Sequence, residues 1–312
     1  MFTTFLNRII CDFIGAVYIH AQQANNGVNF TTFAYQTATM SLEEPPFLNL
    51  RTIIAAKDPI LAKRIPLFML NYLNRIVHVD EINHFLSIYP DKTGSEFVEA
   101  ALNFLQISYQ QTGLEKLSAQ HRYLFVSNHP LGGLDGLTLM HCTGKKFEKI
   151  YFLANDILCN LPTLREIFLP VNKHGAQNPE YLAELHSAYA SDAQIFTFPA
   201  GLCSRKKNGK IQDLKWHSHF IKSAVRFRRD VVPIRFSGRN SDFFYRLAKL
   251  RAMLRINTNI EMLYLVDEMF MQKNSQFTIQ FGEPIPYATF DRSRKPEDWA
   301  LYVRKIVDGM AT

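Results

Sequence analysis

The chain has 312 residues, of which 47% are hydrophobic and 20% are charged, and its 35 basic and 28 acidic side chains give a formal net charge of +7. This composition excludes a disordered or collagen-like chain, because disordered segments are poor in hydrophobic residues and collagen repeats glycine at every third position. The positive charge indicates an acidic partner, either nucleic acid or an anionic membrane surface, and charge alone does not choose between them.

The cysteines and the hydrophobic runs predict a cytoplasmic protein. No pair of cysteines has the CxxC spacing of a redox or zinc site, and no histidine stands at ligand spacing from one. The most hydrophobic early run, residues 5–21, contains Arg8 and Asp12 and is too short and too charged to span a bilayer. His217 and His219 are two residues apart, so on a helix they would face different sides and would not share a metal.

The first third of the chain divides into two parts. Residues 1–45 show no sustained periodicity, so we expect a loosely packed leader there. Met40 stands just before the regular patterning begins. Translation could therefore start at Met1 or at Met40, and the sequence does not choose between them. Residues 46–113 are expected to form an N-terminal helical segment, since apolar residues recur at helical spacing, and Pro66 should kink or restart its first helix.

Residues 114–312 are expected to form one catalytic domain of α/β type. Short apolar runs bounded by turn residues predict strands at 123–127, 150–153, 195–198, 231–236 and 277–281. Longer helical patterns alternate with them, at 178–190, 216–227, 242–255 and 297–307. Strands separated by helices predict a largely parallel central sheet flanked by helices.

The segment SNHPLGGLDG, residues 127–136, follows a predicted strand directly. His129 leaves the strand end and Asp135 stands six positions later, after a glycine turn. A neutral imidazole can take a proton from an alcohol near neutral pH, and a carboxylate on its other nitrogen orients the ring and stabilises the imidazolium. The alternative is a glycine turn with a surface histidine that caps a helix.

A second segment, FPAGLCSRKK at residues 198–207, also follows a predicted strand. Gly201 would allow a ligand to approach the backbone, and Arg205, Lys206 and Lys207 could bind a phosphate or carboxylate. The alternative is an ordinary basic loop, in which Cys203 only packs.

Together these segments resemble the first and third motifs of the glycerolipid (lysophospholipid) acyltransferase superfamily, in its hemolysin-like bacterial branch. Val232-Pro233 is similar to the Val-Pro pair that begins a later strand of that superfamily, and residues 170–174 fall where its second motif would lie. The resemblance covers roughly residues 114–285. It implies that His129 and Asp135 are catalytic, and that Lys173, Gly201, Arg205 and Lys206 contact substrate.

Two departures from the common motifs bear on the acceptor. Five residues separate His129 from Asp135 where the common motif has four, and Ala200 replaces the glutamate of the FPEG motif. The loss of that carboxylate makes lysophosphatidic acid a doubtful acceptor. The branch resembles enzymes that O-acylate an N-(3-hydroxyacyl) amino acid to give glycine- or ornithine-type aminolipids, whose carboxylate head Arg205 or Lys173 could hold.

The implied mechanism is a single displacement. His129 would deprotonate the acceptor hydroxyl as it attacks the thioester of an acyl carrier protein or acyl-CoA, and Asp135 would steady the imidazole. Backbone N–H groups of Gly132, Gly133 or Gly201 would stabilise the oxyanion. No metal or redox cofactor is expected. The alternatives are a conventional 1-acylglycerol-3-phosphate acyltransferase and a catalytically silent lipid-binding protein.

Such substrates lie in a bilayer, so we expect a peripheral protein on the inner face of the cytoplasmic membrane. Residues 243–255 place four apolar side chains at helical spacing among four basic ones, a pattern typical of helices that bind anionic interfaces. Residues 57–75 are a second candidate. The alternative for both is a core-facing helix with a solvated basic face. No nucleic-acid partner is expected, because no RNA-binding signature of interleaved aromatic and basic residues is present.

Overall fold

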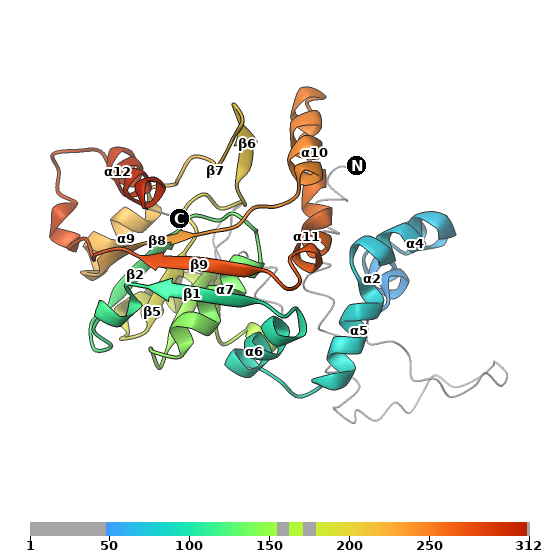
Figure 1. Ribbon diagram of the computed structural model, residues 1–312, viewed down its shortest axis with the longest axis horizontal. Coiled ribbons are helices and arrows are strands. Elements are labelled where there is room, and N and C mark those ends of the chain that lie inside the picture. The colour runs from blue at the N-terminus through green and yellow to red at the C-terminus, as the bar shows by residue number, and fades with distance from the viewer. Residues whose placement is uncertain (1–47, 155–161, 171–178, 311–312) are drawn as a thin grey trace.

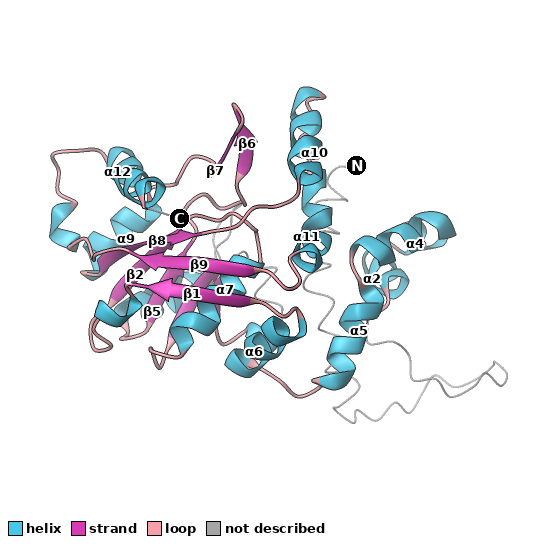
Figure 2. Ribbon diagram, in the orientation of Figure 1, coloured by secondary structure: helices cyan, strands magenta, loops and turns pink. Residues whose placement is uncertain are grey.

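The computed structural model describes residues 48–154, 162–170 and 179–310. The expected leader, and with it the choice between Met1 and Met40, lies outside these residues. The described chain forms a central sheet with helices on both faces and a further group of helices beside it (Figures 1 and 2). The predicted class, a mostly parallel α/β sheet with an N-terminal helical segment, is confirmed.

The N-terminal segment is a series of short helices, two of which begin at a proline. Pro59 begins one helix at its first position, and Pro66 occupies the N-cap of the next, so Pro66 restarts the helix. Apolar side chains between Leu48 and Ile82 form a cluster of their own, against which Leu263 and Tyr264 from the far end of the chain pack. These helices are α2 (Leu50–Lys57), α3 (Pro59–Arg64), α4 (Leu67–Ile76), α5 (Val79–Ile88) and α6 (Gly94–Phe104).

Seven strands form the central sheet, and every neighbouring pair is parallel except β8 with β9. In order across the sheet they are β1 (Ser108–Thr112), β9 (Gln276–Phe281), β8 (Asp230–Phe236), β2 (Tyr123–Ser127), β5 (Gln194–Thr197), β3 (Ile150–Ala154) and β4 (Phe168–Pro170). The five predicted strands are present within one residue of their expected ends. Strand β1 precedes residue 114, so the sheet begins before the expected start of the catalytic domain.

The sheet is buried on both faces, which explains why its central strands are continuous apolar runs. Alternate residues of β2 point to opposite faces: Phe125 packs in one cluster with α6 and α7, and Leu124 in the other with α8, α9 and α12. Phe125 and Phe152 stack on either side of Phe196, each with ring centroids 4.4 Å apart. The covering helices are α7 (Leu134–Gly144), α8 (Pro179–Ala190), α9 (His219–Phe227) and α12 (Pro296–Gly309).

The chain changes direction across the sheet next to β2, which creates a place for a site. After β2 the chain runs through α7 to β3 on one side, and after β5 it runs through α9 to β8 on the other. Ligands of open α/β sheets bind outside the carboxyl ends of the strands at such a switch. The carboxyl ends of β2, β5 and β8 face the side of the sheet on which α10 (Asp242–Met253), α11 (Leu265–Met271) and α4 lie, whereas β1 and β9 run in the opposite direction (Figure 1).

Candidate active site

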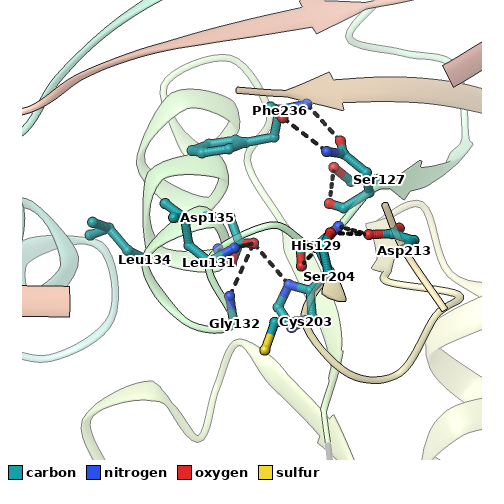
Figure 3. Close-up of polar contacts among 12 residues, drawn as sticks. Ser127, His129, Leu131, Gly132, Leu134, Asp135, Cys203, Ser204, Asp213 and Phe236 are labelled. Carbon is teal, nitrogen blue, oxygen red and sulfur yellow. Dashed lines mark hydrogen bonds and ion pairs between the residues drawn. The ribbon is translucent and has the colours of Figure 1, made fainter. Parts of the chain in front are cut away.

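The residue before His129 attaches the end of β2 to β8. The Asn128 side-chain amide donates to the carbonyl of Phe236 at 2.9 Å and accepts from its N–H at 2.7 Å (Figure 3). Since β2 ends at Ser127, the Asn128 side chain takes the place of a further pair of backbone hydrogen bonds between β2 and β8. His129 therefore begins from a fixed point at the carboxyl edge of the sheet.

The loop after His129 folds around the Asp135 carboxylate. Its Oδ2 accepts the N–H groups of Leu131 at 3.0 Å and Gly132 at 3.3 Å, and its Oδ1 accepts that of Gly136 at 2.9 Å (Figure 3). Gly132 has φ +86°, and a Cβ there would lie 3.1 Å from Cys203 Cβ and 3.0 Å from Leu265 Cδ2. Only glycine fits this turn, and the turn accommodates the fifth residue of the motif.

His129 and Asp135 form the pair that the sequence predicts. Nδ1–H of His129 donates to Oδ2 of Asp135 at 2.9 Å, and the imidazole stacks on Phe198, from the loop after β5, with centroids 4.1 Å apart. The Asp135 side chain is fully buried, whereas that of His129 is 14% exposed. Nε2 of His129 has no hydrogen bond to any residue in the described ranges, so it holds a lone pair that can accept a proton.

The electrostatics keep Asp135 ionised. Burial alone would raise the pKa of this carboxyl, but the neighbouring His129, with its hydrogen bond, and the N–H groups of Leu131 and Gly136 outweigh burial, so the pKa lies below its ordinary value. An ionised acceptor on Nδ1 fixes the imidazole tautomer with the proton on that nitrogen. Nε2 is then the basic atom.

The loop after β5 holds the backbone of His129 from the other side. Ser204 N–H donates to the His129 carbonyl at 2.7 Å, and Asp213 Oδ1 accepts the His129 N–H at 3.2 Å (Figure 3). The sequence predicts neither contact: Asp213 lies 84 positions from His129 and belongs to no recognisable motif, and Ser204 lies within the second segment but acts through its backbone N–H. Ala200 is buried in the cluster around Trp216, where a glutamate would have to lose its hydration.

Arg205 and Lys206 of this loop have protein partners. The Arg205 guanidinium donates to Glu261 Oε1 at 2.8 Å and to the Cys203 carbonyl at 2.6 Å, and its side chain is 13% exposed. Lys206 pairs with Asp242 at 3.1 Å. A role for Arg205 in acceptor binding stays a prediction, and the acceptor would compete with a fully buried glutamate. Lys173 lies outside the described residues.

The three glycines proposed for the oxyanion differ in what their N–H groups do. That of Gly132 donates to Asp135, and that of Gly201, where φ is +67°, donates to the Phe198 carbonyl at 2.9 Å. Gly133 is the N-cap of α7, and a Cβ there would meet nothing within 4 Å. Its N–H makes no hydrogen bond within the described chain, so of the three it is the donor left unpaired, and an oxyanion role for it stays a prediction.

The Cys203 side chain is a buried part of the loop after β5. The Cys203 thiol is fully buried, and burial raises its pKa to about 11, which suits a packing role. In residues 48–154, 162–170 and 179–310, no three His, Cys, Asp or Glu side chains gather in a way that could hold a metal. In the same ranges no helix is long and apolar enough to cross a membrane.

Comparison with known proteins places this chain in a family. Residues 52–308 match the acyltransferase family model, and the chain belongs to this family. It is 47% identical over 256 residues to a lyso-glycine lipid O-acyltransferase of Bacteroides thetaiotaomicron, a match that covers 82% of this chain and 94% of the relative.

Two further matches belong beside this relative. A lyso-glycine lipid O-acyltransferase of Phocaeicola vulgatus is 43% identical over 261 residues, covering 83% of this chain and 94% of that protein. The crystal structure of a 1-acyl-sn-glycerophosphate acyltransferase from Thermotoga maritima superposes with a TM-score of 0.44 at 14% identity, covering 84% of this chain and 98% of that one.

Proposed function

We propose that this acyltransferase transfers a fatty acyl group from a thioester to the hydroxyl of an N-(3-hydroxyacyl)glycine, a lyso-glycine lipid. The acceptor is inferred from the two relatives, which carry this activity in their names and align over 94% of their lengths. The chemistry rests on one observation, the His129–Asp135 pair at 2.9 Å with Nε2 left open. The donor is the thioester of an acyl carrier protein or of CoA.

The reaction balances with His129 as the only proton carrier. Nε2 takes the hydroxyl proton while the acceptor oxygen bonds to the thioester carbonyl carbon. The tetrahedral intermediate then breaks its carbon–sulfur bond, and the imidazolium returns the proton to the thiolate sulfur. The Asp135 carboxylate stabilises the imidazolium between these steps. The Gly133 N–H, at the positive end of α7, stabilises the oxyanion.

The test is a transfer assay with purified protein and competing acceptors. N-(3-hydroxyacyl)glycine and lysophosphatidic acid are supplied together, with acyl-CoA or acyl carrier protein thioester, and products are identified by mass spectrometry. We expect a diacylated glycine lipid from the wild type and from His217→Ala, an exposed histidine that serves as control. His129→Ala should lose at least about a hundredfold in kcat.

Each other outcome corrects a different part of the proposal. Phosphatidic acid as the product would replace the acceptor and leave the base in place. Folded wild-type protein that transfers to neither acceptor would favour the silent lipid-binding alternative. Turnover retained in His129→Ala would remove His129 from the mechanism.

We also propose that helices α4 and α10 carry the surface that lies on the anionic inner face of the cytoplasmic membrane. Large apolar side chains are exposed on both, with Phe68 at 73% and Met253 at 70%. The two helices are joined through Tyr264, whose hydroxyl bonds that of Tyr72 at 2.6 Å and whose ring contacts Phe243 at 4.9 Å. On α10 the core contacts belong to other residues, so its exposed apolar side chains are not explained by packing.

Basic side chains border this surface, as anionic lipid would require. The exposed ones are Lys63, Arg64, Arg75, Arg246, Lys249 and Arg255. Binding to vesicles of phosphatidylcholine mixed with phosphatidylglycerol should fall at least about tenfold when Phe68 and Met253 are both changed to serine. Leu301→Ser, an exposed leucine on α12, is the control. Unchanged vesicle binding by the double variant would move the membrane contact elsewhere.

A further inference from the structure

One buried carboxylate beside the site has no part in the mechanism above. Asp213, 7% exposed, accepts three hydrogen bonds from uncharged donors. These come from the His129 N–H at 3.2 Å and the Ser204 hydroxyl at 2.5 Å, both to Oδ1, and from the Trp216 indole N–H at 2.9 Å, to Oδ2. A carboxylate is an unusual choice for a buried cluster of neutral donors, because it must lose its hydration.

These contacts act on the backbone of His129 rather than on its ring. The His129 N–H is bound by Asp213 and its carbonyl by the Ser204 N–H at 2.7 Å, so both polar groups are held by the segment between β5 and α9. The previous residue, Asn128, is bound to β8 through its side chain. The histidine backbone is thus held on both sides, while Asp135 holds the ring.

Asp213 is itself fixed on both sides. The Arg304 guanidinium, from α12, donates to the Asp213 carbonyl at 2.8 Å and to the Leu214 carbonyl at 3.1 Å. Trp216 is buried among the side chains that cover one face of the sheet. The orientation of the carboxylate therefore follows from the packed core, and a change in it would be passed to His129.

We propose that Asp213 is a positioning residue for transfer: it fixes the main chain of His129 so that Nε2 meets the acceptor hydroxyl at reacting distance. The inference rests on the proposed role of His129 as the base. A misplacement of about 1 Å in a catalytic group can cost on the order of a hundredfold in rate.

The decisive variant is Asp213→Asn, because it conserves shape and changes one acceptor into a donor. The amide oxygen can replace only one carboxylate oxygen. Its NH2 must then face either the indole N–H of Trp216 or the N–H of His129, and neither of these can accept a hydrogen bond. We expect kcat to fall about tenfold to a hundredfold, with little change in the KM for the acceptor, since Asp213 does not contact substrate in this proposal.

Trp216→Phe in the same background should restore much of the loss. Without the indole N–H, the amide NH2 can turn toward the ring while its oxygen accepts from His129. The single variant Trp216→Phe leaves one carboxylate oxygen without its donor and should lower kcat only a few-fold, because the bond to His129 remains. The double variant is therefore expected to exceed Asp213→Asn in kcat, a non-additive result that a general loss of folding would not produce.

The measurements are kcat and acceptor KM for the three variants and for Asp298→Asn, an exposed control on α12, with thermal unfolding of each. Wild-type kcat in Asp213→Asn would overturn the inference. So would a double variant no better than Asp213→Asn, or a loss confined to acceptor KM. If His129→Ala keeps its activity, the proposed base fails instead, which separates the two conclusions.

Discussion

A buried charged side chain lies at each end of the central sheet, Asp135 beside His129 at one end and Arg229 at the other, and the two have opposite roles. At the carboxyl edge, His129 has one ring nitrogen bound and the other open. At the amino edge, the Arg229 guanidinium is fully buried and makes five hydrogen bonds to backbone carbonyls. These carbonyls belong to Tyr123, Ala188, Tyr189, Ser191 and Ala193, at distances from 2.5 to 3.4 Å.

The difference shows what separates a structural charge from a reactive one. The Arg229 bonds close the carboxyl end of α8 onto the starts of β2 and β5, and the dipole of α8 favours a cation there. Burial, together with the charge of Arg122, lowers the pKa of Arg229 to about 10, so it stays charged at neutral pH. All five N–H donors of Arg229 are used, so it has none left for a ligand. His129, in contrast, has only Nδ1 bound, and Nε2 stays available.

The largest expected effect is on activity, from Asp135→Asn. Three donors converge on Oδ2 and one on Oδ1, so the amide oxygen should take the Oδ2 position and the imidazole should keep its orientation. The charge that stabilises the imidazolium is lost, and we expect kcat to fall by roughly 10³-fold. The transfer assay measures this, and a loss below about tenfold would show that the carboxylate charge is unimportant.

The next effect is on stability, from Arg229→Ala at the opposite edge. Five buried carbonyls would lose their donor, so we expect the free energy of unfolding to fall by about 3 kcal/mol or more. Activity per folded molecule should stay unchanged, because the site lies at the other end of the strands. Chemical denaturation and a turnover assay on the folded fraction test both halves. A large drop in kcat without loss of stability would break the comparison.

The two edges also differ in how far the sequence predicts them. The central strands were predicted because burial on both faces makes continuous apolar runs, and His129 was paired with Asp135 because both lie in one short motif. Strand β1, with the sequence SYQQT, was missed because it is an edge strand with mostly exposed side chains. The three-residue strand β4 offers too short a pattern to recognise.

Contacts between distant segments escaped the sequence analysis for a different reason. Asp213 and Glu261 meet their partners only after the sheet has brought together loops 84 and 56 positions apart. Glu261 also binds Arg251 of α10 at 3.0 Å, so it lies between two arginines that the sequence suggested for lipid contact. A single sequence gives the residue types, but only the fold shows that Arg205 and Arg251 are both paired with Glu261.

The smallest expected effect is on the pH dependence of stability, and it distinguishes two buried carboxyls, Asp135 and Glu268. The pKa of Glu268 is raised, since burial outweighs the hydrogen bonds from the Ser241 N–H and hydroxyl and the neighbouring Asp267 raises it further. The pKa of Asp135 is lowered, since His129 and backbone N–H groups outweigh burial. Burial raises the pKa of both carboxyls, and the partners of each one decide the net direction of the shift and so its effect on stability.

The direction in which stability changes with pH follows for each carboxyl from the difference between its folded and unfolded pKa. Asp135 contributes stability above about pH 3.8, its ordinary pKa, and this contribution is lost as pH falls through the lower folded value. Glu268 acts in reverse: stability declines as pH rises from its ordinary 4.5 to the raised folded value and is level above it. Melting temperatures between pH 3 and 7 test this, with about pH 4 dividing the two windows. Glu268→Gln should flatten the upper window and Asp135→Asn the lower one, and a Glu268→Gln profile parallel to wild type above pH 4.5 would contradict the raised pKa.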